Sequence, residues 1–140
     1  MELIKTLSFL DEEIIENIIK LHCSGNIDLD PTYSTGRFYK SGRIQQPTLK
    51  YDIIPQVEGV IQSDACNLPI ESNSLSTIMF DPPFLATKGP SLKKVDGANK
   101  MVKRFGAYDN EKELHQFYIN SLNEFYRILK KDGVLIFKCQ

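Results

Sequence analysis

The sequence LSTIMFDPPF, residues 75–84, is the most informative stretch of the chain. Its first six residues are mostly apolar or β-branched, which is typical of a strand, and the two prolines end that strand because proline donates no hydrogen bond to a sheet. We therefore expect Asp81 at the carboxyl end of a strand, where open α/β sheets bind their ligands. A carboxylate, a proline carbonyl and the ring of Phe84 together suit a planar ligand that carries an amino group. In isolation, these four residues are equally typical of a rigid turn.

Apolar runs on both sides of this stretch predict further strands and two helices. The predicted strands are 27–29, 49–54, 59–62, 75–80 and 134–139. Apolar spacing predicts a helix over about 11–22, with Asp11 as its N-cap, and a longer one over about 110–130. Asp132-Gly133 is expected to turn the chain into the last strand. Apolar strands that alternate with helices predict an α/β fold, a mostly parallel sheet with helices on both faces.

Length and composition are those of an ordinary globular domain. The 140 residues contain 41% hydrophobic and 25% charged residues, so we treat 1–140 as a single domain and exclude a disordered tail or a disulfide scaffold. No apolar run reaches the length of a membrane span, and the N-terminus does not resemble a signal peptide. Three cysteines without metal-ligand spacing indicate reduced thiols, no metal site and a cytoplasmic protein.

A basic segment lies between the DPPF sequence and the second predicted helix. Residues 85–104 carry six basic side chains against one acidic side chain, whereas the chain as a whole has a net charge of −1. The six are Lys88, Lys93, Lys94, Lys100, Lys103 and Arg104. They belong to a predicted loop over about 85–109, and loops of this length in compact domains are usually functional or disordered. We expect them to contact nucleic-acid phosphates, although a solvated lysine-rich loop has the same composition.

Three more acidic residues lie at or after the ends of predicted strands. Asp30 and Asp64 follow the first and third strands as Asp81 follows the fourth, and Asp52 lies near the end of the second. Each of them alone is more typical of a turn or a cap. Because the carboxyl ends of parallel strands meet at one edge of a sheet, four such acids in succession predict one crevice.

In the order and spacing of these motifs, residues 26–139 resemble the class I S-adenosylmethionine-dependent methyltransferases that modify amino groups of nucleic-acid bases. That family has a (D/N/S)PP(Y/F/W) tetrapeptide after its fourth strand, which DPPF matches. The segment DPTYSTGRFY, residues 30–39, looks most like the corresponding segment of phage and bacterial DNA methylases. A dehydrogenase is disfavoured because the chain contains no GxGxxG.

The resemblance implies a Rossmann-like methyltransferase fold, S-adenosylmethionine as cofactor and methyl transfer to a base, with adenine N6 in DNA favoured. Cytosine N4, guanine N2 in RNA and a catalytically silent binding module are the alternatives. The implied catalytic residues are Asp81, Pro82, Pro83 and Phe84. The implied cofactor-binding residues are Asp30, Pro31, Thr35, Gly36, Asp52, Asp64 and Ala65.

The chain departs from the family pattern in two places. Ser34 stands where the family usually has a glycine, and a Cβ there restricts positive φ values and the approach of a cofactor. The family also has about two strands beyond the one predicted at 134–139. The sequence therefore predicts a sheet without its C-terminal strands. Either these 140 residues are a fragment of a longer enzyme, or a homodimer or another partner covers the open edge.

Overall fold

The structure is a computed structural model that describes residues 3–5, 7–84, 108 and 110–139. Within these residues, five strands form one parallel sheet in the order β3-β2-β1-β4-β5. The strands are β1 Leu29–Asp30, β2 Leu49–Asp52, β3 Ile61–Gln62, β4 Leu75–Phe80 and β5 Leu129–Phe137. The helices are α1 Asp11–His22, the short 3-10 helix η1 Arg37–Tyr39, and α3 Glu111–Ile128. The predicted α/β class with a parallel sheet is confirmed, and the arrangement is compatible with a Rossmann-like fold.

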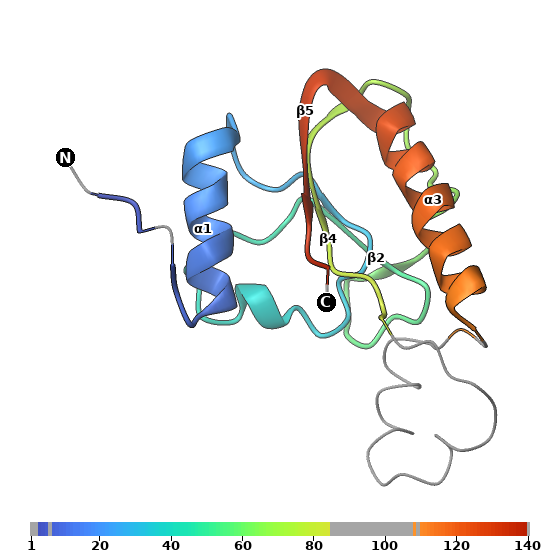
Figure 1. Ribbon diagram of the computed structural model, residues 1–140, viewed down its shortest axis with the longest axis horizontal. Coiled ribbons are helices and arrows are strands. Elements are labelled where there is room, and N and C mark those ends of the chain that lie inside the picture. Colours follow the sequence, from blue (N-terminus) through green and yellow to red (C-terminus); the bar gives the residue numbers. More distant parts are fainter. Residues whose placement is uncertain (1–2, 6, 85–107, 109, 140) are drawn as a thin grey trace, which may run out of the picture.

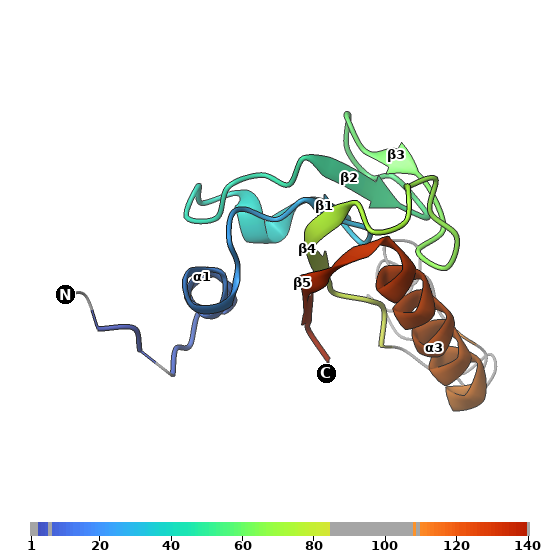
Figure 2. The same ribbon diagram turned by 90° about the horizontal axis from the view of Figure 1, so that it is seen from above.

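The two long helices cover opposite faces of the sheet (Figures 1 and 2). Side chains of β4 alternate between these faces, as period-two geometry requires. Ile78 and Phe80 face α3, where the rings of Phe80 and Phe125 are 4.7 Å apart in an edge-on contact. Met79 faces the other way and packs in the same cluster as Ile15 of α1. All five side chains are buried, so β4 lies at the centre of both halves of the core.

Both helices lie where the sequence predicts them, but one cap differs. α1 covers Asp11–His22 as expected, yet its N-cap is Leu10, and Asp11 is the first helical residue. The Asp11 carboxylate instead bonds Arg37 at 2.8 Å, a contact with η1 that local sequence does not reveal. α3 has a conventional cap, because the side chain of Asn110 accepts the N–H of Glu113 at 3.0 Å.

Asp132 and Gly133, where the sequence predicts a turn before the last strand, lie within the bounds of β5, but neither of them pairs with β4. Leu75 pairs with Leu129 and Thr77 pairs with Val134, so β5 carries extra residues between two pairs that are close together on β4. The irregularity is a bulge at the edge of the sheet, where one side of the strand has no ladder to maintain. The predicted strand 134–139 therefore corresponds to the regular second half of β5.

The bounds of β1 and β2 differ from the prediction. β1 covers Leu29–Asp30, so it starts two residues later and ends one residue later than the predicted 27–29. β2 ends at Asp52 and not at residue 54. After β2, the carboxylate of Asp52 accepts the N–H of Ile54 at 2.9 Å, and this local turn removes that N–H from the sheet. Side-chain bonds thus shorten the strand that apolar residues alone would extend.

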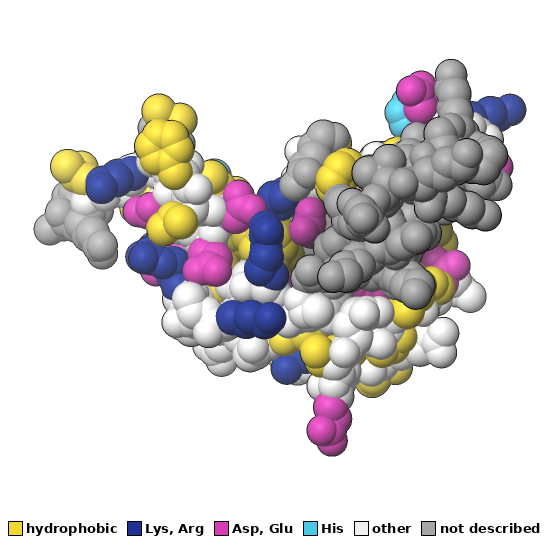
Figure 3. Space-filling model, turned by 90° about the horizontal axis from the view of Figure 1, so that it is seen from below, with side chains coloured by type: hydrophobic (Ala, Val, Ile, Leu, Met, Phe, Trp, Pro, Cys, Tyr) yellow, Lys and Arg dark blue, Asp and Glu magenta, His cyan; other side chains and the backbone are white. Residues whose placement is uncertain are grey.

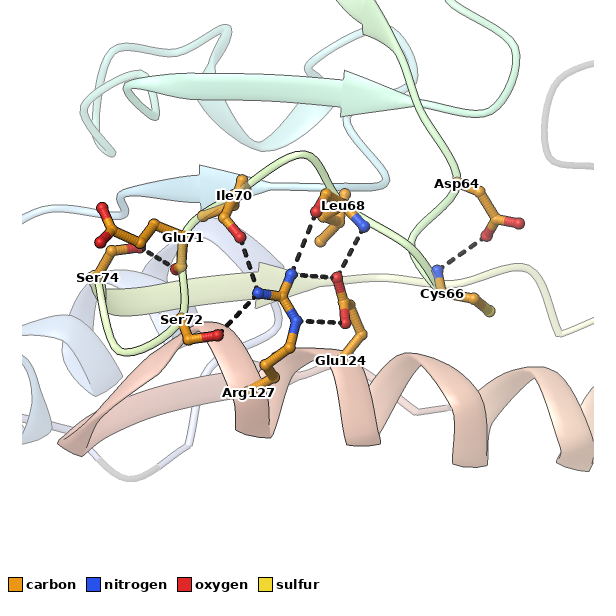
Figure 4. A network of polar contacts seen from close by, with 9 residues as sticks. All are labelled: Asp64, Cys66, Leu68, Ile70, Glu71, Ser72, Ser74, Glu124 and Arg127. Atoms are coloured by element: carbon orange, nitrogen blue, oxygen red, sulfur yellow. Dashed lines mark hydrogen bonds and ion pairs between the residues drawn. The ribbon is translucent and has the colours of Figure 1, made fainter.

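The loop between β3 and β4 is attached to α3 by Arg127 and Glu124 (Figure 4). Arg127 donates to the carbonyls of Leu68 and Ile70 at 3.2 and 2.9 Å and to the hydroxyl of Ser72 at 3.0 Å. It also pairs with Glu124 at 2.6 Å, which lowers the pKa of that carboxyl, and Glu124 accepts the N–H of Leu68 at 2.8 Å. These contacts fix the segment that begins at Asp64.

No helix in the described part of the chain has the length and apolar character needed to cross a membrane. The described thiols Cys23, Cys66 and Cys139 are all free. Across the described residues, no group of three or more metal-ligating side chains is arranged to hold a metal ion.

Candidate functional site

Four carboxylates lie along the carboxyl edge of the sheet, as predicted. Asp30 and Asp52 are the last residues of β1 and β2, Asp64 lies two residues beyond β3, and Asp81 directly follows β4. Figure 3 shows this side of the molecule, where acidic and basic side chains lie next to one another. The parallel direction of all four strands brings together acids that are far apart in the sequence.

A cleft of about 560 Å³ opens at this edge, within the range of small-molecule sites. Six of the predicted site residues line it, namely Pro31, Asp52, Asp64, Ala65, Asp81 and Pro83. The other lining residues come from the loops after β1, β2 and β3 and from the chain around α3, namely Thr32, Ile53, Ile54, Cys66, Tyr108, Glu113, Gln116, Phe117 and Asn120. Of the remaining predicted residues, Asp30, Thr35, Gly36, Pro82 and Phe84 do not line this cleft.

The prediction that all four acids line one crevice is wrong for Asp30, because this residue is buried and both of its oxygens bind neighbouring groups. Its Oδ1 accepts the backbone N–H of Thr32 at 3.0 Å, and its Oδ2 accepts the hydroxyl of Tyr39 at 2.7 Å. Burial raises the pKa of Asp30 to about 7, although these two hydrogen bonds oppose the shift. Asp30 therefore holds the loop after β1 against η1, and its carboxylate is turned into the protein.

Asp52 lies in the cleft wall and also supports that loop. Its Oδ2 accepts the backbone N–H of Ser34 at 2.8 Å, while its Oδ1 accepts the N–H of Ile54. Burial raises the pKa of Asp52, and the two N–H bonds oppose this effect. Each carboxylate oxygen has a second lone pair, so Asp52 can still accept a hydrogen bond from a ligand.

The loop after β1 contains two residues with positive φ. Gly36 has φ +68°, and a Cβ at this position would overlap the side chain of Tyr33. That ring stacks on Tyr39, with centroids 5.5 Å apart and planes at 4°. Ser34 has φ 52°, so it lies in the left-handed region that glycine adopts more readily than residues with a Cβ. The backbone at this position thus has a positive φ even though the residue is a serine.

Asp81 faces the cleft and is only partly buried. Its side chain is 26% exposed, and its Oδ1 lies 3.8 Å from Nζ of Lys138. Burial raises the pKa of Asp81, and the nearby charges of Lys138 and Arg37 oppose the shift. Its backbone N–H donates to Oγ1 of Thr32 at 3.0 Å. Among the described residues, its carboxylate oxygens accept no hydrogen bond, which distinguishes it from Asp30 and Asp52.

The rest of the tetrapeptide divides between the cleft and its surroundings. Pro83 lines the cleft, Pro82 is buried next to it, and Phe84 is 40% exposed outside the lining. The basic residues predicted to contact phosphates all lie outside the described residues, and of the predicted loop 85–109 only Tyr108 is described. Their part in the site stays a prediction.

Sequence reasoning missed the wall that α3 contributes. Glu113, Gln116 and Asn120 lie on one side of the helix at spacings of three and four, and their polar side chains look like an ordinary exposed face. Only the packing of α3 against β4 shows that this face borders the cleft. Cys66 also lines the cleft, but burial raises the pKa of its thiol, and its Sγ lies 3.4 Å from the hydroxyl of Ser121. It has the environment of a packing residue and not of a nucleophile.

Comparison of the chain with protein-family models, curated proteins and solved structures gives no match. The function is therefore inferred from the motifs and from the chemistry of the cleft.

Proposed function

We propose that this protein transfers a methyl group from S-adenosylmethionine to the exocyclic amino group of a nucleic-acid base, with adenine N6 in DNA as the favoured target. The observation that carries this proposal is the position of Asp81. This carboxylate, which accepts no hydrogen bond from the described residues, lines a cleft that Asp52 and Asp64 also line. The cleft thus offers one acid to a methyl acceptor and two acids to a cofactor.

The residues present are compatible with the proposed cofactor. A volume of about 560 Å³ accommodates a ligand of drug size, and the lining includes both apolar and polar side chains. Ile53 and Ile54 are half exposed beside Asp52 and offer apolar contact to a flat ring. Asp52 and Asp64 offer oxygen acceptors for hydroxyl and amino groups. When bound, the cofactor supplies an electrophilic methyl group on a positively charged sulfur.

The tetrapeptide supplies the groups that activate the acceptor nitrogen. An exocyclic amino group is a weak nucleophile because its lone pair is delocalised into the ring of the base. Asp81 and the carbonyl of Pro82 can accept its two N–H bonds and favour a pyramidal nitrogen with the lone pair directed outward. After transfer, the carboxylate of Asp81 is in position to accept the proton that the nitrogen releases. Phe84, which is 40% exposed, can stack on a base that has left the duplex.

The proposal is tested by incubating the protein with radiolabelled S-adenosylmethionine and duplex DNA, single-stranded DNA or structured RNA. Digestion of the product to nucleosides then separates methylation of adenine N6 from that of cytosine N4 or guanine N2. Asp81→Ala should lower the rate by at least about a hundredfold, because it removes an acceptor used in the transition state. Calorimetry should show unchanged cofactor binding in Asp81→Ala and weaker binding in Asp64→Ala.

Asp132→Ala is the matched control, since Asp132 is an exposed acid in the β5 bulge and does not line the cleft. Full activity of Asp81→Ala would overturn the mechanism. A folded wild-type protein that does not bind the cofactor would instead favour the silent binding module.

A further inference from the structure

The backbone of the DPPF turn has few groups that can anchor it. Proline has no N–H, so Pro82 and Pro83 offer only carbonyls, and the first N–H of the turn belongs to Asp81. Two side chains outside the turn bind its backbone. Oγ1 of Thr32 accepts the N–H of Asp81 at 3.0 Å, and the hydroxyl of Tyr118 donates to the carbonyl of Pro83 at 3.1 Å. These bonds hold the turn near its beginning and near its end.

The hydroxyl of Thr32 is oriented by the buried acid behind it. Oγ1 lies 3.4 Å from Oδ1 of Asp30, to which Thr32 also donates its backbone N–H. A hydroxyl has one proton and two lone pairs, so a proton directed at Asp30 leaves a lone pair for the N–H of Asp81. Tyr39 holds the other oxygen of Asp30 at 2.7 Å, which fixes the direction of the carboxylate. A continuous set of bonds thus runs from η1 to the turn.

Tyr118 reaches the turn from the opposite side, on α3. Its ring packs edge-on against Phe137 of β5, with centroids 5.6 Å apart, and against Phe117 at 6.0 Å. Burial raises the pKa of the Tyr118 phenol, so that it stays protonated and keeps its donor. With the ring held by two neighbours, the hydroxyl has a defined position beside the carbonyl of Pro83.

Two acceptors of the turn are left without a hydrogen bond from any described residue. They are the carboxylate of Asp81 and the carbonyl of Pro82, and the nearest charge to the former is Nζ of Lys138 at 3.8 Å. We propose that Thr32 and Tyr118 are positioning residues that hold the DPPF turn by its other polar groups, so that the carboxylate of Asp81 stays directed into the cleft and the carbonyl of Pro82 stays unbonded beside it. This inference rests on the proposed methyl transfer, for which the orientation of both acceptors determines the rate.

Three substitutions test the role of each hydroxyl. Thr32→Val keeps the shape of the side chain and removes the hydroxyl, Thr32→Ser keeps the hydroxyl, and Tyr118→Phe removes only an oxygen. Thr32→Val and Tyr118→Phe should each lower kcat by about tenfold or more, with the cofactor Kd changed by less than about threefold. Thr32→Ser should recover most of the lost rate. Two matched controls should keep full activity. They are Tyr126→Phe, at a residue of the same helix that is 87% exposed, and Thr48→Val, at an exposed threonine.

A second measurement tests the hydrogen bond between Asp81 and Thr32 independently of methyl transfer. Amide hydrogen exchange at Asp81 should become at least about fivefold faster in Thr32→Val and return toward the wild-type rate in Thr32→Ser. Unchanged kcat in both Thr32→Val and Tyr118→Phe would overturn the positioning role, as would a Thr32→Ser variant as slow as Thr32→Val. A wild-type protein without methyl transfer would contradict the proposed function instead, and hydrogen exchange would still decide whether Thr32 holds the turn.

Discussion

The loops after β1 and β4 leave neighbouring strands at the same edge of the sheet, yet they use their acids in opposite ways. Asp30, at the start of the first loop, is 2% exposed, and its oxygens bind Thr32 and Tyr39. Asp81, at the start of the second, faces the cleft, and its backbone rather than its carboxylate makes the anchoring bond. A strand end therefore predicts where an acid lies. Its role follows from which of its atoms are already bonded.

The largest loss of stability is expected from distorting the loop after β1, which Asp30 supports. Gly36→Ala should lower the free energy of unfolding by about 2–3 kcal/mol, because the new Cβ meets the side chain of Tyr33 and the residue must keep φ +68°. Tyr33 cannot move freely, since it stacks on Tyr39 and donates to Gln46 at 2.6 Å. Urea denaturation measures the loss.

Gly42→Ala is the matched control for this prediction. Gly42 has a similar φ of +76°, but no atom lies within 4 Å of the position that a Cβ would occupy. The unfolding free energy of Gly42→Ala should therefore fall only by the cost of the backbone strain, about 1 kcal/mol. Equal losses in the two variants would mean that the contact with Tyr33 contributes nothing.

Features specified by neighbouring residues could be predicted from the sequence, whereas features that depend on distant contacts could not. α1 and β4 have the predicted bounds because each is specified by neighbouring residues, an apolar period in one and an apolar run ended by prolines in the other. The bulge at Asp132-Gly133 could not be predicted, since it follows from pairing with β4, more than fifty residues away. The position of Asp30 at the sheet edge was predictable from its strand. Its burial was not, because the group that satisfies it, Tyr39, belongs to a short helix with no clear sequence signature.

A smaller effect on the unfolding free energy is expected from the ionisation of Asp30. Its pKa is raised from 3.8 to about 7, chiefly by burial, so the folded state binds this proton more tightly than the unfolded state. The resulting stabilisation is fully present below pH 3.8 and is lost as the pH rises through about 7. Asp30→Asn cannot ionise, and the hydroxyl of Tyr39 can accept from its amide. The variant should show a flatter dependence of unfolding free energy on pH between about 4 and 8.

Urea denaturation at several pH values checks this prediction, and the informative quantity is the slope of the difference between wild type and variant. A pKa difference of one unit corresponds to about 1.4 kcal/mol, so a shift of this size is measurable. The exposed Asp132→Asn serves as the control. Parallel curves for wild type and Asp30→Asn would mean that Asp30 is ionised in the folded protein at the same pH as in the unfolded chain, and its contrast with Asp81 would then rest on hydrogen bonding alone.

The smallest effect is expected at Ser34, the serine with a positive φ in the loop after β1. Ser34→Gly relieves a left-handed conformation at φ 52°, which costs a residue with a Cβ about 1 kcal/mol, but it also gives the unfolded chain more freedom, and the two effects nearly cancel. The N–H bond to Asp52 is a backbone bond and survives the change. We therefore expect unfolding free energies within about 1 kcal/mol and a cofactor Kd within about threefold of wild type, measured by denaturation and calorimetry, with Ser34→Ala as the control that keeps the Cβ. Cofactor binding more than tenfold tighter in Ser34→Gly alone would show that the Cβ of Ser34 blocks the cofactor, and that the first loop limits binding as well as supporting the sheet edge.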